Sequence, residues 1–100
     1  MAKQLISPRL SKDYLELSEQ IKKAIKHGLE DGGIAAKIFI EPISGTKLMR
    51  VQVVSPQFAK LLHSERQDLV WRIVSEALKF EERHRISMIL PLTPKELIGK

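Results

Sequence analysis

The sequence predicts one small α+β domain of order α-β-β-α-β-α, with helices on one face of a three-stranded mixed sheet. Apolar residues recur at helical spacing over residues 11–29 and 65–80. Branched and aromatic residues are concentrated in two short segments between them, 35–41 and 49–54. A chain of 100 residues is too short to form two independent cores, so residues 11–100 are expected to fold as one domain.

The first helix is predicted over residues 11–29. Ser11 is a suitable N-cap, and Asp13 and Glu16 lie in the first turn, where the helix dipole favours acidic side chains. The Asp-Gly-Gly sequence at 31–33 ends the helix, because glycine readily leaves helical geometry. One apolar stripe runs along this helix: Leu17, Ile21, Ala24, Ile25 and Gly28.

Two strands follow, at 35–41 and 49–54, and a turn-rich loop, Pro-Ile-Ser-Gly-Thr at 42–46, joins them. This loop composition favours an antiparallel hairpin. The second strand alternates, so one face of the sheet receives its apolar side chains and the other its polar ones. The apolar face carries Met49, Val51 and Val53, and the polar face carries Arg50 and Gln52.

The second helix is predicted over residues 65–80. Ser64 and Gln67 have the S-x-x-Q spacing of a capping box, in which each side chain serves a backbone N–H group. The apolar stripe of this helix consists of Leu69, Val70, Ile73, Val74, Ala77 and Leu78.

The third strand is predicted around Ile86, Met88 and Leu90, which alternate along one face. A strand, a helix and a further strand are joined by a right-handed crossover, so this strand is expected to run parallel to the second. The last helix has a strong start signal, with Thr93 as N-cap, proline at the first helical position and Glu96 three residues after the cap.

Composition limits the possible functions. The chain has 17 Lys and Arg against 12 Asp and Glu, a net charge of +5, which permits a polyanionic partner without requiring one. It has no cysteine, which excludes disulfides, zinc fingers and thiol nucleophiles and fits a cytoplasmic setting. Apolar runs are too short to span a membrane, and residues 1–10 form an arm without the apolar core of a secretion signal.

Several motifs resemble those of BolA-like proteins. They are Val-Val-Ser-Pro-Gln-Phe at 53–58, Glu-Arg at 65–66, Leu-Val followed by an aromatic residue at 69–71, and Leu-Thr-Pro-Lys-Glu-Leu at 92–97. Their order and spacing extend the resemblance over about residues 15–98. The resemblance implies a fold of the class II KH type, which agrees with the element order derived above.

The resemblance also implies a function, because BolA-like proteins act with monothiol glutaredoxins in iron–sulfur cluster handling, and some bind DNA as regulators. The family's cluster ligand is a histidine at the start of the last strand, sometimes joined by His or Cys from the hairpin loop. Here Arg85 stands at that position and His84 one residue earlier, Gln67 replaces the family's helix histidine, and residues 42–48 lack His and Cys. No resident cofactor is therefore predicted. A [2Fe–2S] cluster shared with a partner would have His84 as its candidate ligand from this chain.

Basic residues define a second hypothesis, nucleic-acid binding. Arg66 and Arg72 are separated by roughly 240° of helix rotation, so they share no narrow face. Residues 56–64 contain no glycine, whereas KH recognition uses a G-x-x-G loop. Any binding would be led by phosphate contacts and sensitive to salt. The candidate contacts are Lys60, Arg66, Arg72, Arg83 and Arg85 around the second helix, and Lys47 and Arg50 on the hairpin.

Catalytic patterns are weak. His27 and His63 have no serine or carboxylate at a relay spacing, and the adjacent Glu81 and Glu82 point apart. The sequence therefore predicts a non-enzymatic adaptor with a regulatory or stress-linked role, which binds a glutaredoxin or other protein near His84, Arg85 and the second helix. The alternatives are a DNA- or RNA-binding regulator and a scaffold that has lost its metal role.

Overall fold

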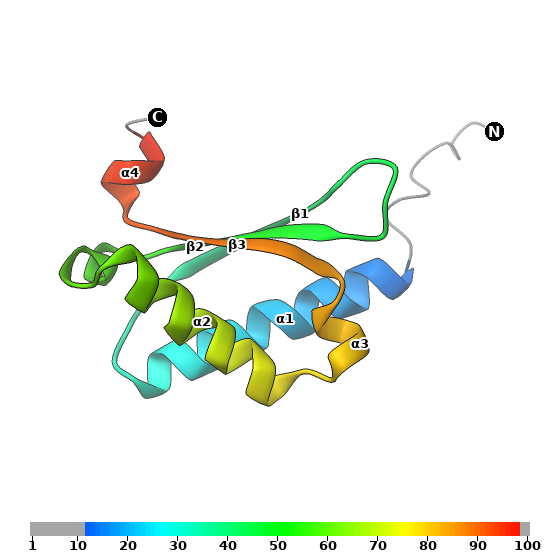
Figure 1. The fold of residues 1–100 in the computed structure, drawn as a ribbon, viewed down its shortest axis with the longest axis horizontal. Coiled ribbons are helices and arrows are strands. Elements are labelled where there is room, and N and C mark those ends of the chain that lie inside the picture. Colours follow the sequence, from blue (N-terminus) through cyan, green and yellow to red (C-terminus); the bar gives the residue numbers. More distant parts are fainter. Residues whose placement is uncertain (1–11, 99–100) are drawn as a thin grey trace.

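A computed structural model describes residues 12–98, and within them four α-helices, one 3-10 helix and three strands (Figure 1). The predicted arm, residues 1–10, lies outside the described residues. In chain order the elements are α1 (Lys12–Asp31), β1 (Lys37–Pro42), β2 (Met49–Val54), η3 (Pro56–Lys60), α2 (His63–Ala77), α3 (Phe80–Arg83), β3 (Ile86–Leu92) and α4 (Pro94–Ile98).

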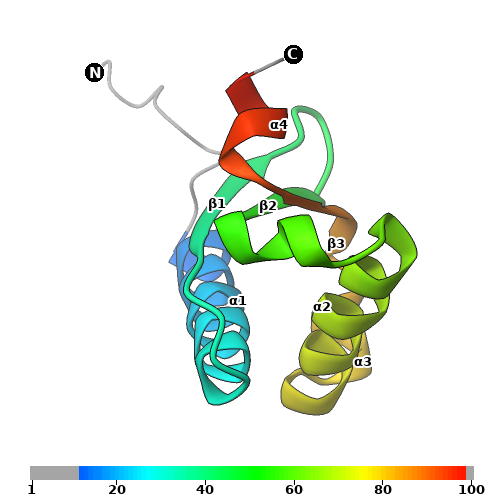
Figure 2. The same cartoon turned by 90° about the vertical axis from the view of Figure 1, so that its left-hand side faces the viewer.

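The strands form one sheet of order β1-β2-β3, in which β1 and β2 are antiparallel and β2 and β3 are parallel. The predicted mixed sheet is thus confirmed. α1 and α2 lie side by side beneath it (Figures 1 and 2). The prediction that every helix lies on this face is wrong for α4, which lies on the other side (Figure 1). There Pro94 and Leu97 line the same surface depression as Phe39 and Val54.

The core lies between the sheet and the two long helices. The predicted apolar face of β2 is confirmed, because Met49, Val51 and Val53 are fully buried. Most of the predicted α1 stripe is buried as well, whereas Ala24 and Gly28 are half-buried. A Cβ atom on Gly28 would lie 2.6 Å from Ile73 Cγ2 of α2, so this glycine allows α1 and α2 to approach closely. The buried α1 residues are Tyr14, Leu17, Ile21, Ile25 and Leu29.

β3 departs from the predicted alternation of Ile86, Met88 and Leu90. Consecutive residues of β2 pair with Ile86 and then Met88, so Ser87 is an extra residue in the ladder. A bulge of this kind turns the following side chains to the opposite face. Ile89 is therefore buried in the core, while Met88 is exposed.

The second helix ends earlier than predicted. α2 stops at Ala77, and a separate turn, α3, follows after Leu78 and Lys79, which are extended. The Glu82 carboxylate accepts the N–H of Lys79 at 2.8 Å and caps α3. Arg83 donates to the carbonyl of Leu78 at 3.0 Å. These bonds satisfy backbone groups that the interruption of the helix would otherwise leave without partners.

The predicted capping box of Ser64 and Gln67 is also wrong. α2 begins at His63, one residue before Ser64, and the carboxylate of Glu65 accepts the N–H of Leu62 at 2.9 Å. Glu65 is therefore the third residue of the helix and the one that caps it.

Gln67 instead connects α2 to the sheet. Its Nε2 donates to the carbonyl of Ile89 at 2.9 Å, and its Oε1 accepts the indole N–H of Trp71 at 3.1 Å. Ile89 is buried and Trp71 is half-buried, so the side-chain amide supplies hydrogen bonds that water would replace poorly.

We expect Gln67→Leu to lower the free energy of unfolding by about 1–3 kcal/mol, because it leaves a carbonyl and an indole N–H without their partners. Ser64→Ala should change it by less than about 0.5 kcal/mol, since Ser64 makes no capping bond. Urea unfolding of both variants provides the measurement. Equal losses in the two variants would contradict this assignment.

Candidate partner-binding site

Arg66 is the predicted contact residue most fully engaged by the chain itself. It is only 4% exposed, and its guanidinium donates to the Glu96 carboxylate at 2.8 Å. It also donates to the carbonyls of Leu61 at 3.2 Å and Pro91 at 3.3 Å. One side chain of α2 thus joins β3, α4 and the residue that follows η3, and its charge is directed inward.

Glu96 completes the predicted start of α4. Its N–H donates to Thr93 Oγ1 at 3.1 Å, and its carboxylate accepts the N–H of Thr93 at 2.9 Å, so this capping box is confirmed. The hydrogen bond from Arg66, followed by that from the Thr93 backbone, lowers the pKa of Glu96 from 4.5 to about 2. Residues that carried the family resemblance therefore pair with each other.

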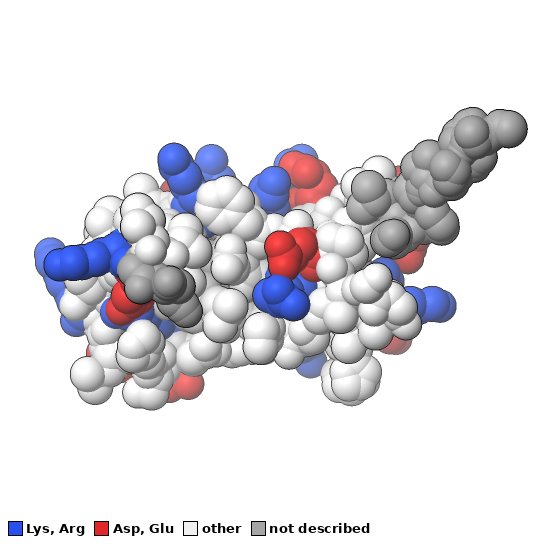
Figure 3. Space-filling model, turned by 90° about the horizontal axis from the view of Figure 1, so that it is seen from above, with Lys and Arg blue, Asp and Glu red and all other residues white. Residues whose placement is uncertain are grey.

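On the uncovered side of the sheet most charged groups lie toward the margins, while an acidic and a basic group adjoin one another near the middle (Figure 3). On this face Arg50 forms a 2.7 Å ion pair with Glu41 of the neighbouring strand. Glu41 also acts on Tyr14 of α1, whose pKa is raised first by burial and then by this negative charge. The positive charge of Arg50 is therefore already paired with a carboxylate of the same chain, that of Glu41.

Arg85 fastens the start of β3 to two distant segments. Its Nε donates to the carbonyl of Lys47 at 2.6 Å, and its guanidinium forms a 3.2 Å ion pair with Asp13 of α1. The residue that stands at the family's ligand position is therefore a cross-link between the hairpin, α1 and β3.

Phe80, Arg83 and His84 gather at the turn before β3, and we call them the α3 corner. Phe80 is 61% exposed. The centroid of its ring lies 4.6 Å from that of His84, and the Arg83 guanidinium lies 5.6 Å from it. Sequence reasoning missed Phe80. In a helix continuing to residue 80, Phe80 lies three residues after Ala77 and seven after Ile73, on the apolar stripe, so helical spacing predicts its burial and not its exposure.

The α3 corner does not fit a metal or cluster held by this chain alone. His84 offers one imidazole, while the neighbouring Arg83 and Arg85 disfavour a cation. Over residues 12–98 no three His, Asp or Glu side chains are grouped so as to hold a metal ion, and the sequence has no cysteine. Further ligands would have to come from a partner.

Three of the predicted basic contacts remain exposed and form no ion pair with any described residue, namely Lys47, Lys60 and Arg72. Lys47 lies in the hairpin before β2, and Lys60 lies in η3 after it. A six-residue strand separates them, about 20 Å in length. The structure therefore does not bring Lys47 and Lys60 together into one groove.

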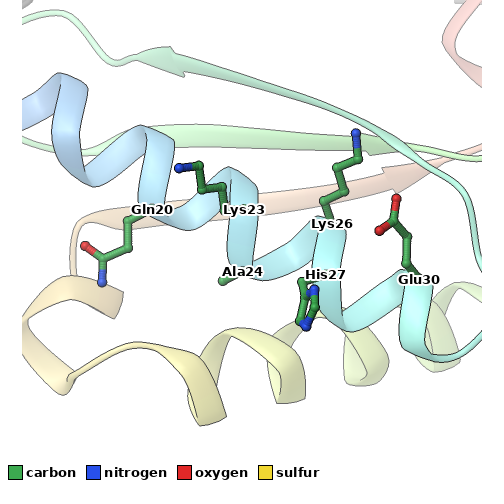
Figure 4. Close-up of a pocket in the computed structure, with 6 residues that line it drawn as sticks. All are labelled: Gln20, Lys23, Ala24, Lys26, His27 and Glu30. Atoms are coloured by element: carbon green, nitrogen blue, oxygen red, sulfur yellow. The ribbon is translucent and has the colours of Figure 1, made fainter.

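A shallow depression on α1 has the form of an open surface (Figure 4). Gln20 and His27 point toward α3 and α2, whereas Lys23, Lys26 and Glu30 point away from them (Figure 4). Their diverging side chains do not converge on a point where a reacting atom could be held.

Neither a scan against protein-family models nor a search of the curated proteins finds a match to this chain. Within residues 12–98 no helix is both long enough and apolar enough to cross a membrane. The function proposed below is therefore inferred from the geometry of the chain's own residues.

Proposed function

We propose that this chain is a non-enzymatic adaptor domain that binds a protein partner at the α3 corner. The observation that carries this proposal is the exposure of Phe80, 61%, on a turn where two other side chains hold its ring. Aromatic residues and arginine are enriched among the residues that dominate the binding energy of protein interfaces, and an aromatic ring buries much area while only two side-chain torsions are fixed.

The α3 corner is already ordered. Arg83 lies 5.6 Å from the Phe80 ring, and its guanidinium is held by the carbonyls of Leu78 and Ser75 at 3.0 and 3.4 Å. Glu82 is occupied as well, since its carboxylate accepts the N–H of Lys79. A partner would therefore meet a fixed aromatic surface, which lowers the entropy lost on binding.

We propose a monothiol glutaredoxin as the partner and a regulatory role for the complex. The resemblance to BolA-like proteins supports this choice, and the element order with parallel β2 and β3 supports a class II KH-like fold. His84 is the side chain that this chain would present to a [2Fe–2S] cluster carried by the partner. Its exposed position beside Phe80 supports that role.

The test is a titration with a monothiol glutaredoxin, both carrying its own cluster and cluster-free, followed by calorimetry and co-elution. We expect a complex whose Kd rises about tenfold or more in Phe80→Ala, because an interface aromatic residue contributes at least 1–2 kcal/mol. With the cluster-loaded partner, His84→Ala should also change the visible absorption of the complex.

Leu62→Ala is the matched control, since Leu62 is a similarly exposed apolar residue, 68%, at the other end of α2. It should bind as the unmodified chain does. Absence of a complex, or a complex that Phe80→Ala leaves unchanged, would overturn the proposal. A complex sensitive to Phe80→Ala but indifferent to His84→Ala would retain docking and remove the ligand role.

A titration with labelled DNA at two salt concentrations tests the alternative function. Binding at low salt that Lys60→Ala or Arg72→Ala weakens would favour a nucleic-acid regulator over the adaptor. The separation of Lys47 and Lys60 by the length of β2 leads us to expect no such binding.

A further inference from the structure

The two edges of the sheet differ in how their backbone groups are covered. On the outer side of β3, Gln67 donates to the carbonyl of Ile89 at 2.9 Å and Arg66 donates to that of Pro91 at 3.3 Å. Pro91 itself has no N–H group to offer. α2 therefore occupies the outer edge of β3 and leaves no place for a further strand.

At the outer edge of β1, by contrast, no strand or helix of residues 12–98 pairs with the backbone. The N–H of Ile43 donates to the carbonyl of Leu48 at 3.0 Å, so these residues form a hydrogen-bonded pair. In an antiparallel ladder such pairs alternate with pairs whose backbone groups point outward. In that alternation the N–H and C=O groups of Ile38 and Ile40 point away from β2. They form no hydrogen bond with a described residue outside the sheet. Figure 2 shows β1 at one side of the sheet, with α1 beneath it and no described element beyond it.

The side chains of β1 are self-complementary. Lys37, Phe39 and Glu41 lie on the uncovered face, with opposite charges equally spaced on either side of Phe39. A second copy of β1, placed antiparallel with Phe39 opposite Phe39, brings each Lys37 opposite a Glu41. The same register places Ile38 opposite Ile40, and these are the residues whose backbone groups point outward. The outward-pointing backbone groups and the charged side chains thus favour the same register of β1 against a second β1.

We propose that β1 pairs with β1 of a second copy of this chain, forming a two-fold symmetric dimer with one continuous sheet. Lys37 forms no ion pair with a described residue, and Phe39 is 48% exposed, so both have contacts to gain. Pro42 ends the ladder because it lacks an N–H. The paired segment is short, so association is weak. The dimer uses no residue of the α3 corner and does not depend on the adaptor function.

Sedimentation equilibrium from about 10 µM to 1 mM tests this pairing. We expect a reversible rise in mass from 11.4 kDa toward twice that value. Lys37→Glu and Glu41→Lys should each raise the Kd for self-association about tenfold or more, because both cross-strand pairs become like-charged. Mixing the two variants should restore association, since every pair in the mixed dimer is then oppositely charged.

Lys47→Glu is the matched control, because it makes the same charge change in the hairpin loop, away from the β1 ladder. It should associate as the unmodified chain does. At high concentration the amides of Ile38 and Ile40 should exchange slowly with solvent. A monomer at every concentration, or a dimer that persists in both charge variants, would overturn the pairing, as would failure of the mixture to associate.

Discussion

Replacing Arg66 by alanine is expected to lower the free energy of unfolding by about 3 kcal/mol, one of the two largest effects predicted for a single change. Breaking a buried ion pair by removing one partner costs roughly 3–5 kcal/mol. We expect a loss at the lower end of this range, because the Glu96 side chain that remains is 36% exposed and its carboxylate can be hydrated. Urea unfolding at pH 7 provides the measurement.

The arrangement of three hydrogen-bond acceptors around residue 66 requires arginine at this position. The guanidinium serves the Glu96 carboxylate and two backbone carbonyls, those of Leu61 and Pro91, from one planar group. A lysine ammonium is a compact charge without this fork. Arg66→Lys should therefore recover only part of the stability lost in Arg66→Ala. Full recovery would show that charge alone matters.

The pH dependence gives an independent check on the same ion pair. Folding lowers the pKa of Glu96 from 4.5 to about 2, chiefly through the Arg66 hydrogen bond. The carboxylate therefore stabilises the fold fully above pH 4.5, and this contribution disappears as the pH falls from 4.5 to 2. In Glu96→Gln and Arg66→Ala, stability should fall less steeply over that interval. An unchanged slope would refute the assignment.

Gly28→Ala is expected to lower the free energy of unfolding by up to about 2 kcal/mol, although alanine is the better helix former. Alanine in a helix gains about 1 kcal/mol over glycine. Here, however, the added Cβ would lie 2.6 Å from Ile73 Cγ2 and 3.0 Å from Cγ1. Isoleucine is β-branched and holds one χ1 rotamer in a helix, so it yields poorly, and overpacking costs roughly 1–3 kcal/mol.

A double-mutant cycle separates these two effects. Ile73→Ala removes the three atoms nearest to the new Cβ, which lie 2.6–3.1 Å from it. In that background Gly28→Ala should become stabilising by about 1 kcal/mol, so the sign of the same substitution reverses. Thermal or urea unfolding of the four proteins measures this. A destabilising effect of equal size in both backgrounds would rule out the contact between α1 and α2 as its cause.

Residues quoted for the family resemblance prove to support the fold. Ser55 is fully buried, and its hydroxyl accepts the N–H of Gln57 to cap η3. Phe58 is fully buried in the core, and Arg66 pairs with Glu96. Such residues are informative about architecture. The candidate site, by contrast, depends on Phe80, which none of these motifs contains.

The sequence by itself determined the features whose causes are local. Helical spacing predicted α1, turn chemistry predicted the hairpin between β1 and β2, and the Thr93 box predicted the start of α4. These signals lie within a few residues of what they specify, because caps, turns and periodic faces are made by near neighbours. The parallel pairing of β2 and β3 followed from the handedness of a single crossover.

Only the tertiary structure decided which distant groups meet. Gln67 bonds Ile89, 22 residues away, instead of capping its own helix. Arg66 finds Glu96 at a separation of 30 residues, so a basic residue that looked available is buried. The bulge in β3, the turn that exposes Phe80 and the open edge of β1 likewise arise from packing between elements. Sequence spacing carries no record of such contacts, because it describes neighbours along the chain and not across the core.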